Sequence, residues 1–210
     1  FLSALEVGED RVVRFAVRGD DQSGSVLASA VESCRKATEG GMILQSAFTA
    51  LPEYLFKLRA SARALDPLGS DAMLFFAAAV SDFHVPLSNM ATHKIQSSGG
   101  AMSLELQPVP KLLGCIKGHW APRSYCVSFK LETDMNILIS KARKAVTKYG
   151  MDLVIANELK TRYDVVTLVG GVGGDTLDEI ELADADEIER PLVEAVCERH
   201  ATFVGSVADA

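Results

Sequence analysis

The residues of this 210-residue chain that are best suited to chemistry lie close together. Ser81 and Asp82 follow directly on an apolar run, residues 74–80, and one lysine, Lys94, precedes the stretch 97–100 (Ser-Ser-Gly-Gly), whose composition is typical of a loop. In open α/β sheets ligands bind at the carboxyl ends of strands, and a loop that carries a cation can close over an anion. The pattern therefore indicates a site for an anionic substrate. Asp82 alone is equally well explained as a turn former or as the N-cap of a short helix.

Three further sets of residues are candidates, and each has a simpler structural explanation. Phe129 ends an apolar strand, where most phenylalanines belong to the core. Lys144 and Lys148 lie one helical turn apart and share a helix face, which in most proteins faces only solvent. Asn157 ends a second apolar strand, residues 152–156, where a buried amide needs a hydrogen-bond partner.

Other patterns in the sequence do not predict a site. Ser81, Asp82 and His84 are too close in sequence for a hydrolase triad, which is assembled from distant segments. His84 and His93 are only two histidines in one loop, and they do not predict a metal site. The glycine-rich stretch 170–175 is followed by a predicted strand instead of a helix, so we interpret it as a hairpin loop and not as a phosphate loop.

The composition limits the class of protein. The 28 acidic residues outnumber the 21 lysines and arginines, giving a net charge of −7, which argues against a nucleic-acid or anionic-membrane surface. The four cysteines contain no CxxC pair, which predicts free thiols in a reducing compartment. No apolar run reaches the roughly 20 residues of a membrane span, and the first residues do not resemble a signal peptide. We therefore expect a cytoplasmic protein, although Phe1 need not be its natural start.

The elements that must position the candidate residues alternate between helix and strand. This order is typical of a parallel sheet with right-handed crossovers, so we predict a single α/β domain over residues 1–210 with a doubly wound, mostly parallel sheet. Residues 11–17 form either a short strand or a connection. The helices are expected at 25–38, 49–66 (with Thr49 as N-cap), 108–113, 137–148 and 184–200, and the strands at 42–48, 72–80, 102–106, 125–129, 152–156, 165–169 and 179–182.

Five motifs in fixed order carry a resemblance to a known family: AAAVSDF (77–83), HKIQSSGG (93–100), PVPKLLG (108–114), SFKLETD (128–134) and IANEL (155–159). Together they resemble the eukaryotic form of phosphopantothenoylcysteine synthetase, the ligase of coenzyme A synthesis. The resemblance runs in register from about Phe1 to His200. The family's N-terminal portion, with its glycine-rich nucleotide loops and a substrate-binding asparagine, has no counterpart here, so the chain resembles the C-terminal two-thirds of the family pattern.

The resemblance implies a reaction and a set of site residues. The carboxylate of 4'-phosphopantothenate attacks the α-phosphorus of ATP or CTP, and cysteine then displaces the nucleoside monophosphate from the acyl-nucleotidyl anhydride; the eukaryotic motifs favour ATP. We infer Mg²⁺ from this chemistry, because no metal-ligand motif is visible. The implied phosphopantothenate-binding residues are Ala78, Ala79 and Asp82, the catalytic loop lysine is Lys94, and the nucleotide-binding residues are Phe129, Lys144, Lys148 and Asn157.

The resemblance also implies an architecture and leaves two alternatives. It implies a Rossmann-like fold with a projecting β element, about residues 93–108, that pairs subunits into a homodimer. A chain that starts at Phe1 is expected to expose apolar sheet edges and to lack part of its nucleotide site. The alternatives are a nucleotide-binding oxidoreductase of doubly wound architecture and a non-catalytic homologue that keeps only dimer or partner contacts. The sequence upstream of Phe1 would distinguish them.

Overall fold

The structure of the protein is a computed structural model that describes residues 5–7, 13–15, 22–93, 95, 101–170, 176–182 and 187–208. The chain divides into two units, Phe1–Phe48 and Thr49–Ala210, which are described separately. That the whole chain forms a single domain remains a prediction from the sequence.

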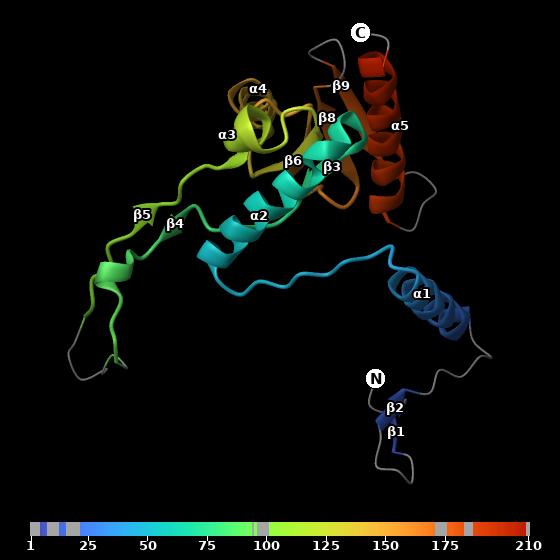
Figure 1. Cartoon of the computed structure of the whole chain (residues 1–210), viewed down its shortest axis with the longest axis horizontal. Helices are drawn as coiled ribbons and strands as arrows, with labels where there is room; N and C mark the ends of the chain where they lie inside the picture. Colours follow the sequence, from blue (N-terminus) through green and yellow to red (C-terminus); the bar gives the residue numbers. More distant parts are fainter. Residues whose placement is uncertain are drawn as a thin grey trace. The chain divides into compact units, whose positions relative to one another are not determined.

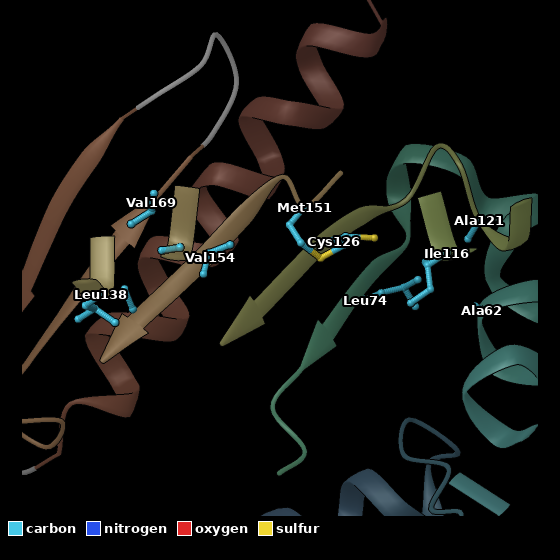
Figure 2. Close-up of a cluster of buried hydrophobic side chains, with 11 residues drawn as sticks. Ala62, Leu74, Ile116, Ala121, Cys126, Leu138, Met151, Val154 and Val169 are labelled. Carbon is cyan, nitrogen blue, oxygen red and sulfur yellow. The ribbon is translucent and has the colours of Figure 1, made fainter. Parts of the chain in front are cut away.

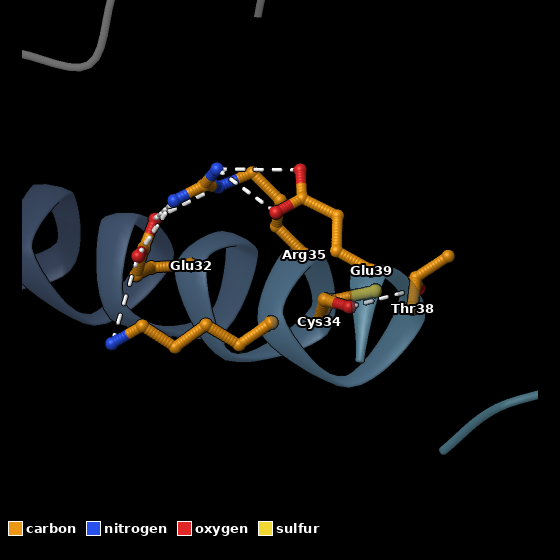
Figure 3. A network of polar contacts seen from close by, with 6 residues as sticks. Glu32, Cys34, Arg35, Thr38 and Glu39 are labelled. Carbon is orange, nitrogen blue, oxygen red and sulfur yellow. Dashed lines mark hydrogen bonds and ion pairs between the residues drawn. The ribbon is translucent and has the colours of Figure 1, made fainter. Parts of the chain in front are cut away.

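In the first unit, β1 (Leu5–Val7) and β2 (Val13–Phe15) form an antiparallel pair that precedes α1 (Gln22–Glu39). On the exposed surface of α1, Arg35 bonds both Glu32 and Glu39 (Figure 3). Each such pair stabilises a helix by only about 0.2–0.5 kcal/mol.

The strand predicted at residues 42–48 is absent. The segment has no regular structure, and Leu44 is 95% exposed. A strand needs a neighbour to pair its N–H and C=O groups, and no described strand pairs with this segment.

The second unit contains a five-stranded sheet in which four strands run in the same direction. Its order is β3-β6-β7-β8-β9; β3, β6 and β7 are mutually parallel, and β8 is antiparallel to both of its neighbours. This agrees with the predicted mostly parallel sheet. Figure 1 shows the strands between their flanking helices. The bounds are β3 (Met73–Phe76), β6 (Tyr125–Glu132), β7 (Leu153–Glu158), β8 (Val165–Val169) and β9 (Leu177–Glu181).

Helices cover both faces of the sheet. Alternate residues of each strand point to opposite sides, so the helices on the two faces contact different strand residues. On one face, α2 (Leu51–Leu65) and α4 (Met135–Tyr149) pack on strand residues such as Val154 (Figure 2). On the other face, α5 (Glu189–Ala208) packs on strand residues such as Ile155. The sheet is therefore doubly wound, as predicted. The fully buried residues of the two faces include Cys126, Leu138, Ala142 and Val154 on the first, and Val127, Leu153, Ile155 and Leu168 on the second.

Short elements connect the main ones. Two strands, β4 (Phe83–His84) and β5 (Gln107–Pro108), form a separate antiparallel ladder. Helix α3 (Leu113–Cys115) continues into a π-helical turn. Separately, no described helix is both long and apolar enough to cross a bilayer. The other short helices are the 3-10 helices Asp66–Asp71 and Leu87–Asn89 and the π-helical turn Ile116–Trp120.

Several predicted boundaries were wrong. Strand β3 ends at Phe76 instead of residue 80, because it lies at the sheet edge and pairs with β6 only over Met73–Phe76, and it is not buried on both faces, since Phe75 is exposed. Residues 102–106 form no strand and are exposed. The helix predicted from Pro108 begins at Leu113. The cap of α2 is Ala50, not Thr49, whose backbone N–H instead donates to the Glu53 carboxylate.

Tyr125 offers a test of this core. It is 1% exposed, its ring lies 5.1 Å from that of Phe203, and within the described residues its hydroxyl has no hydrogen-bond partner. Burial, aided by the charge of Asp152, raises the pKa of Tyr125 to about 12. The folded state thus disfavours the tyrosinate, so stability from this group is complete below about pH 10 and is lost as the pH approaches 12.

We expect Tyr125→Phe to raise the free energy of unfolding at pH 7 by about 1 kcal/mol, because it removes an unpaired buried hydroxyl. The loss of stability between about pH 10 and 12 should also become smaller. Denaturant unfolding measures both changes. Tyr163→Phe, at an exposed position, is the matched control and should change stability by less than about 0.5 kcal/mol. A less stable Tyr125→Phe variant would contradict the prediction.

Candidate anion-binding site

A cavity of about 530 Å³ lies at the carboxyl ends of β3 and β6, between α2 and α4. Its volume is in the range of small-molecule sites, and among the described residues its lining contains five lysines against one carboxylate, that of Asp82. Such an excess of positive charge, in a protein whose net charge is −7, favours an anionic ligand. The lysines are Lys111, Lys130, Lys141, Lys144 and Lys148.

Asp82 is held at the cavity by the β4–β5 ladder. The register pairs Phe83 with Pro108, which brings Asp82 beside the residues that follow β5. The Val109 N–H donates to the Asp82 carbonyl at 2.9 Å, and the Lys111 ammonium donates to the Asp82 carboxylate. This hydrogen bond and the Lys111 charge lower the pKa of Asp82, so the carboxylate is ionised at neutral pH. Asp82 is 70% exposed, and its pairing therefore adds little to stability.

Helix α4 presents three of the lysines on one face, because Lys141, Lys144 and Lys148 are spaced by three and four residues. The helix begins at Asp134, whose side chain accepts from the Asn136 N–H at 2.9 Å, and it ends at a left-handed glycine, Gly150, with φ 68°. Within the described residues, Lys144 and Lys148 have no ion-pair partner, so their ammonium groups are available to a ligand. Lys148 also lies 5.1 Å from the Tyr149 ring centroid.

The strand ends supply the apolar part of the lining. Phe76 and Ala78 come from β3 and the segment after it, and Ser128 and Phe129 come from β6. The Phe129 ring meets the Phe75 ring edge to face, with centroids 5.3 Å apart and an interplanar angle of 74°. This contact fixes the ring at the cavity wall, where its face or edge can contact a bound molecule.

The structure brings most of the predicted site residues together. Ala78, Asp82, Phe129, Lys144 and Lys148 all line the cavity. Ala79 is exposed next to the lining but does not form part of it.

Two predicted residues are not found in the lining. Asn157 lies within β7, not beyond its end, and its buried side-chain oxygen has no hydrogen-bond partner in the described part of the chain. Its role at a nucleotide stays a prediction. Lys94 lies outside the described residues.

The sequence analysis missed three of the five lysines. Lys111 and Lys130 lie inside two of the family motifs, PVPKLLG and SFKLETD, and Lys141 shares the face of Lys144 by its spacing. Lys130 follows the predicted strand 125–129 and Lys141 shares a helix face with Lys144, so local spacing indicates these two, whereas Lys111 has no such signal.

The described residues offer no protein-built metal site. Among the described residues there is no group of three His, Cys, Asp or Glu side chains that could hold a metal ion. Near the cavity, the Asp82 and Glu132 carboxylates are both engaged by lysines.

The four cysteines are free thiols, as predicted, and burial raises the pKa of the Cys126 thiol.

Residues 61–192 match the family model described as the DNA/pantothenate metabolism flavoprotein C-terminal domain. Phosphopantothenate–cysteine ligase 2 of Oryza sativa is 39% identical over 204 residues, covering 97% of this chain and 61% of the relative. The human phosphopantothenate–cysteine ligase is 44% identical over 180 residues, covering 85% of this chain and 58% of the relative. The chain thus spans only part of the length of these relatives.

Solved structures agree with the sequence matches. A Cab2 variant in complex with phosphopantothenate-cysteine superposes with a TM-score of 0.81 at 30% identity, covering 99% of this chain and 67% of that chain. The flavoprotein of DNA/pantothenate metabolism from Streptococcus pneumoniae, 18% identical with a TM-score of 0.57, shares the fold. The chain therefore belongs to the DNA/pantothenate metabolism flavoprotein C-terminal domain family, as a relative of the eukaryotic phosphopantothenate–cysteine ligases.

Proposed function

We propose that this chain acts in a phosphopantothenate–cysteine ligase, which joins the carboxylate of 4'-phosphopantothenate to the amine of cysteine in coenzyme A biosynthesis. The observation that carries the proposal is the lysine-lined cavity at the carboxyl ends of β3 and β6, in a chain of this family. The reaction gathers a phosphate, a carboxylate and a triphosphate in one place. The five lysines of the cavity offset this negative charge locally, whereas the protein as a whole has a net charge of −7.

The chemistry requires activation of the acid, because a carboxylate has no good leaving group for an amine to displace. The phosphopantothenate carboxylate attacks the α-phosphorus of a nucleoside triphosphate, and pyrophosphate leaves. The cysteine amine then attacks the acyl carbon of the anhydride, loses a proton, and the nucleoside monophosphate leaves. In this proposal Asp82, Ala78 and Ala79 hold phosphopantothenate, Lys144 and Lys148 bind the triphosphate, and Phe129 and Asn157 contact the nucleoside.

The nucleotide is ATP or CTP, and Mg²⁺ arrives with it. Mg²⁺ commonly binds through substrate phosphates with only one or two protein carboxylates, which suits a cavity whose one lining carboxylate among the described residues, Asp82, is paired with a lysine. When bound, Mg²⁺ offsets charge on the phosphates. The chain's own contribution is to bind and orient the anions through its ammonium groups.

The oxidoreductase alternative is not favoured, because the relatives that this chain resembles are phosphopantothenate–cysteine ligases. The remaining alternative, a homologue without activity, is decided by assay. The protein at its natural length is incubated with phosphopantothenate, cysteine, Mg²⁺ and either ATP or CTP. Pyrophosphate release and 4'-phosphopantothenoylcysteine, detected by mass spectrometry, are expected with one of the nucleotides. No product with either nucleotide would contradict the proposal.

We further propose that the protein is a homodimer that pairs through the segment between β4 and β5. The described residues of this segment, together with Phe83 of β4, expose many apolar side chains, including Leu87, which is 84% exposed. Exposed apolar surface of this extent is typical of an interaction site. The apolar residues are Phe83, Leu87, Met90, Ile95, Met102, Leu104 and Leu106.

Replacing Leu104 and Leu106 together with lysine is expected to raise the dimer dissociation constant by at least about 100-fold, because each burial of a leucine contributes about 1.5–3 kcal/mol. Sedimentation equilibrium measures the constant. Leu68→Lys, at an exposed leucine outside the segment, is the control and should leave the dimer unchanged. A natural-length protein that is monomeric at micromolar concentration would rule out the dimer.

A further inference from the structure

The Glu132 carboxylate lies beside the cavity and is bound by two lysines, but Glu132 is not one of the residues that line the cavity. It is the last residue of β6, and its side chain is only 14% exposed. Lys130 Nζ lies 2.9 Å from Glu132 Oε1, and Lys141 Nζ lies 2.9 Å from Glu132 Oε2. Both lysines line the cavity, one from β6 and the other from α4. One carboxylate therefore ties together two walls of the cavity.

This arrangement leaves the two lysines able to bind a ligand. An ammonium group has three N–H donors, and Glu132 accepts one from each lysine, so each lysine keeps two donors for another acceptor. The hydrogen bonds from Lys141 and Lys130 lower the pKa of Glu132, which is therefore ionised at neutral pH. Lys144 and Lys148, in contrast, have no carboxylate partner among the described residues that would hold their ammonium groups in place.

We propose that Glu132 is a positioning residue that orients Lys130 and Lys141 toward the phosphate groups of the substrates. The inference rests on the proposed function, since it concerns the anions of that reaction. A lysine side chain loses rotamer entropy when a ligand fixes it. A carboxylate that fixes two lysines in advance removes part of this loss, and affinity rises accordingly.

Glu132 also has an effect that lowers the affinity for an anion, because a carboxylate near an anion site repels the anion. Lys130 and Lys141 are still 36% and 43% exposed, so this part of the cavity is open to water and the repulsion is screened. Orientation acts through two hydrogen bonds between charged groups, which are among the stronger ones in proteins. Orientation is therefore the larger effect, and loss of Glu132 weakens anion binding.

The test is Glu132→Gln, which keeps the size of the side chain and removes its charge. We expect the Kd for inorganic tripolyphosphate, measured by titration calorimetry, to rise at least about tenfold. In the ligase assay, the KM for the nucleotide is expected to rise in parallel while kcat changes less. Electrostatic repulsion alone predicts the reverse, a lower Kd.

Glu158→Gln is the matched control. Glu158 lies opposite Glu132 in the β6–β7 register, and in the described part of the chain it accepts from the Thr161 hydroxyl at 3.3 Å and pairs with no cavity lysine. The control removes the same charge from the same end of the sheet, and its Kd is expected to stay within about twofold of the wild-type value.

A double-mutant cycle separates positioning from a general structural role. In a protein that carries Lys130→Met and Lys141→Met, Glu132→Gln is expected to have no further effect on the Kd, because no lysine remains to be oriented. A full effect in that background would overturn the inference. So would a Glu132→Gln Kd at or below the wild-type value, or a wild-type protein that binds no tripolyphosphate. A wild-type protein that binds tripolyphosphate but makes no product contradicts the proposed function and not this inference, which the Kd ratio decides.

Discussion

Replacing Lys144 and Lys148 together with methionine is expected to lower kcat/KM for the nucleotide by about 1,000-fold. Each lysine is assigned a hydrogen bond to a charged phosphate, and such a bond contributes about 1.5–3 kcal/mol, or roughly 10- to 100-fold. The two lysines lie one turn apart on α4, line the cavity and lack a carboxylate partner among the described residues. Methionine keeps the apolar stem and the helix propensity, so the fold should be unaffected.

Steady-state kinetics with the nucleotide varied measure the effect, and thermal unfolding checks the fold. Lys160→Met is the control, because Lys160 is exposed and does not line the cavity. It should keep near-normal activity. If Lys144 and Lys148 merely form a solvated helix face, the double variant will behave like this control, and the assignment of the triphosphate to α4 will be wrong.

The strands β6 and β7 and the helix α4 were predicted well from the sequence, because buried elements have a distinctive content and spacing of apolar residues. The central parts of β6 and β7 are buried on both faces, and their residues 125–129 and 153–156 are apolar except for Ser128. Helix α4 has apolar residues at helical spacing and a glycine that ends it. In each case the local pattern and the tertiary packing require the same structure.

The errors occurred where an apolar sequence does not specify its partner. Residues 42–48 and 102–106 read as strands, but a strand also needs a neighbour with which to form hydrogen bonds, and no described strand pairs with either segment. The alanines after Phe76 extend the apolar run in the sequence, but the strand ends at Phe76. Alanine is small enough to lie in a buried or an exposed position, so its presence does not indicate a buried strand. Apolar patterning shows that a segment tends to be buried, but not which segment covers it.

The site was predicted in part for a related reason. Asp82 follows the apolar run 74–80 in the sequence and Lys144 lies on a helix face, and simple spacing rules find both. Lys111 and Glu132 act through partners that are distant in sequence: Lys111 bonds a residue 29 positions away, and Glu132 bonds Lys141 from the next helix. Pairings of this kind depend on the register of β4 with β5 and on the packing of α4, which no local pattern specifies.

Lys94→Gln is expected to lower the rate of pyrophosphate release by about 100- to 1,000-fold, even when cysteine is withheld. Lys94 lies outside the described residues, so its role rests on its place in the sequence. It is a single lysine in a segment that ends in Ser-Ser-Gly-Gly, shortly after the aspartate proposed to hold the acid. Lys94→Arg keeps the charge and should retain more activity than Lys94→Gln.

The physical reason lies in the first step of the proposed reaction. As the phosphopantothenate carboxylate approaches the α-phosphate, negative charge accumulates and passes to the departing pyrophosphate. A loop cation that closes over the triphosphate offsets this charge where water is excluded. The second step needs less help, because the nucleoside monophosphate is already a good leaving group. Rapid mixing of Lys94→Gln with nucleotide, Mg²⁺ and phosphopantothenate isolates the first step, and a normal burst of pyrophosphate would show that Lys94 does not act in activation of the acid.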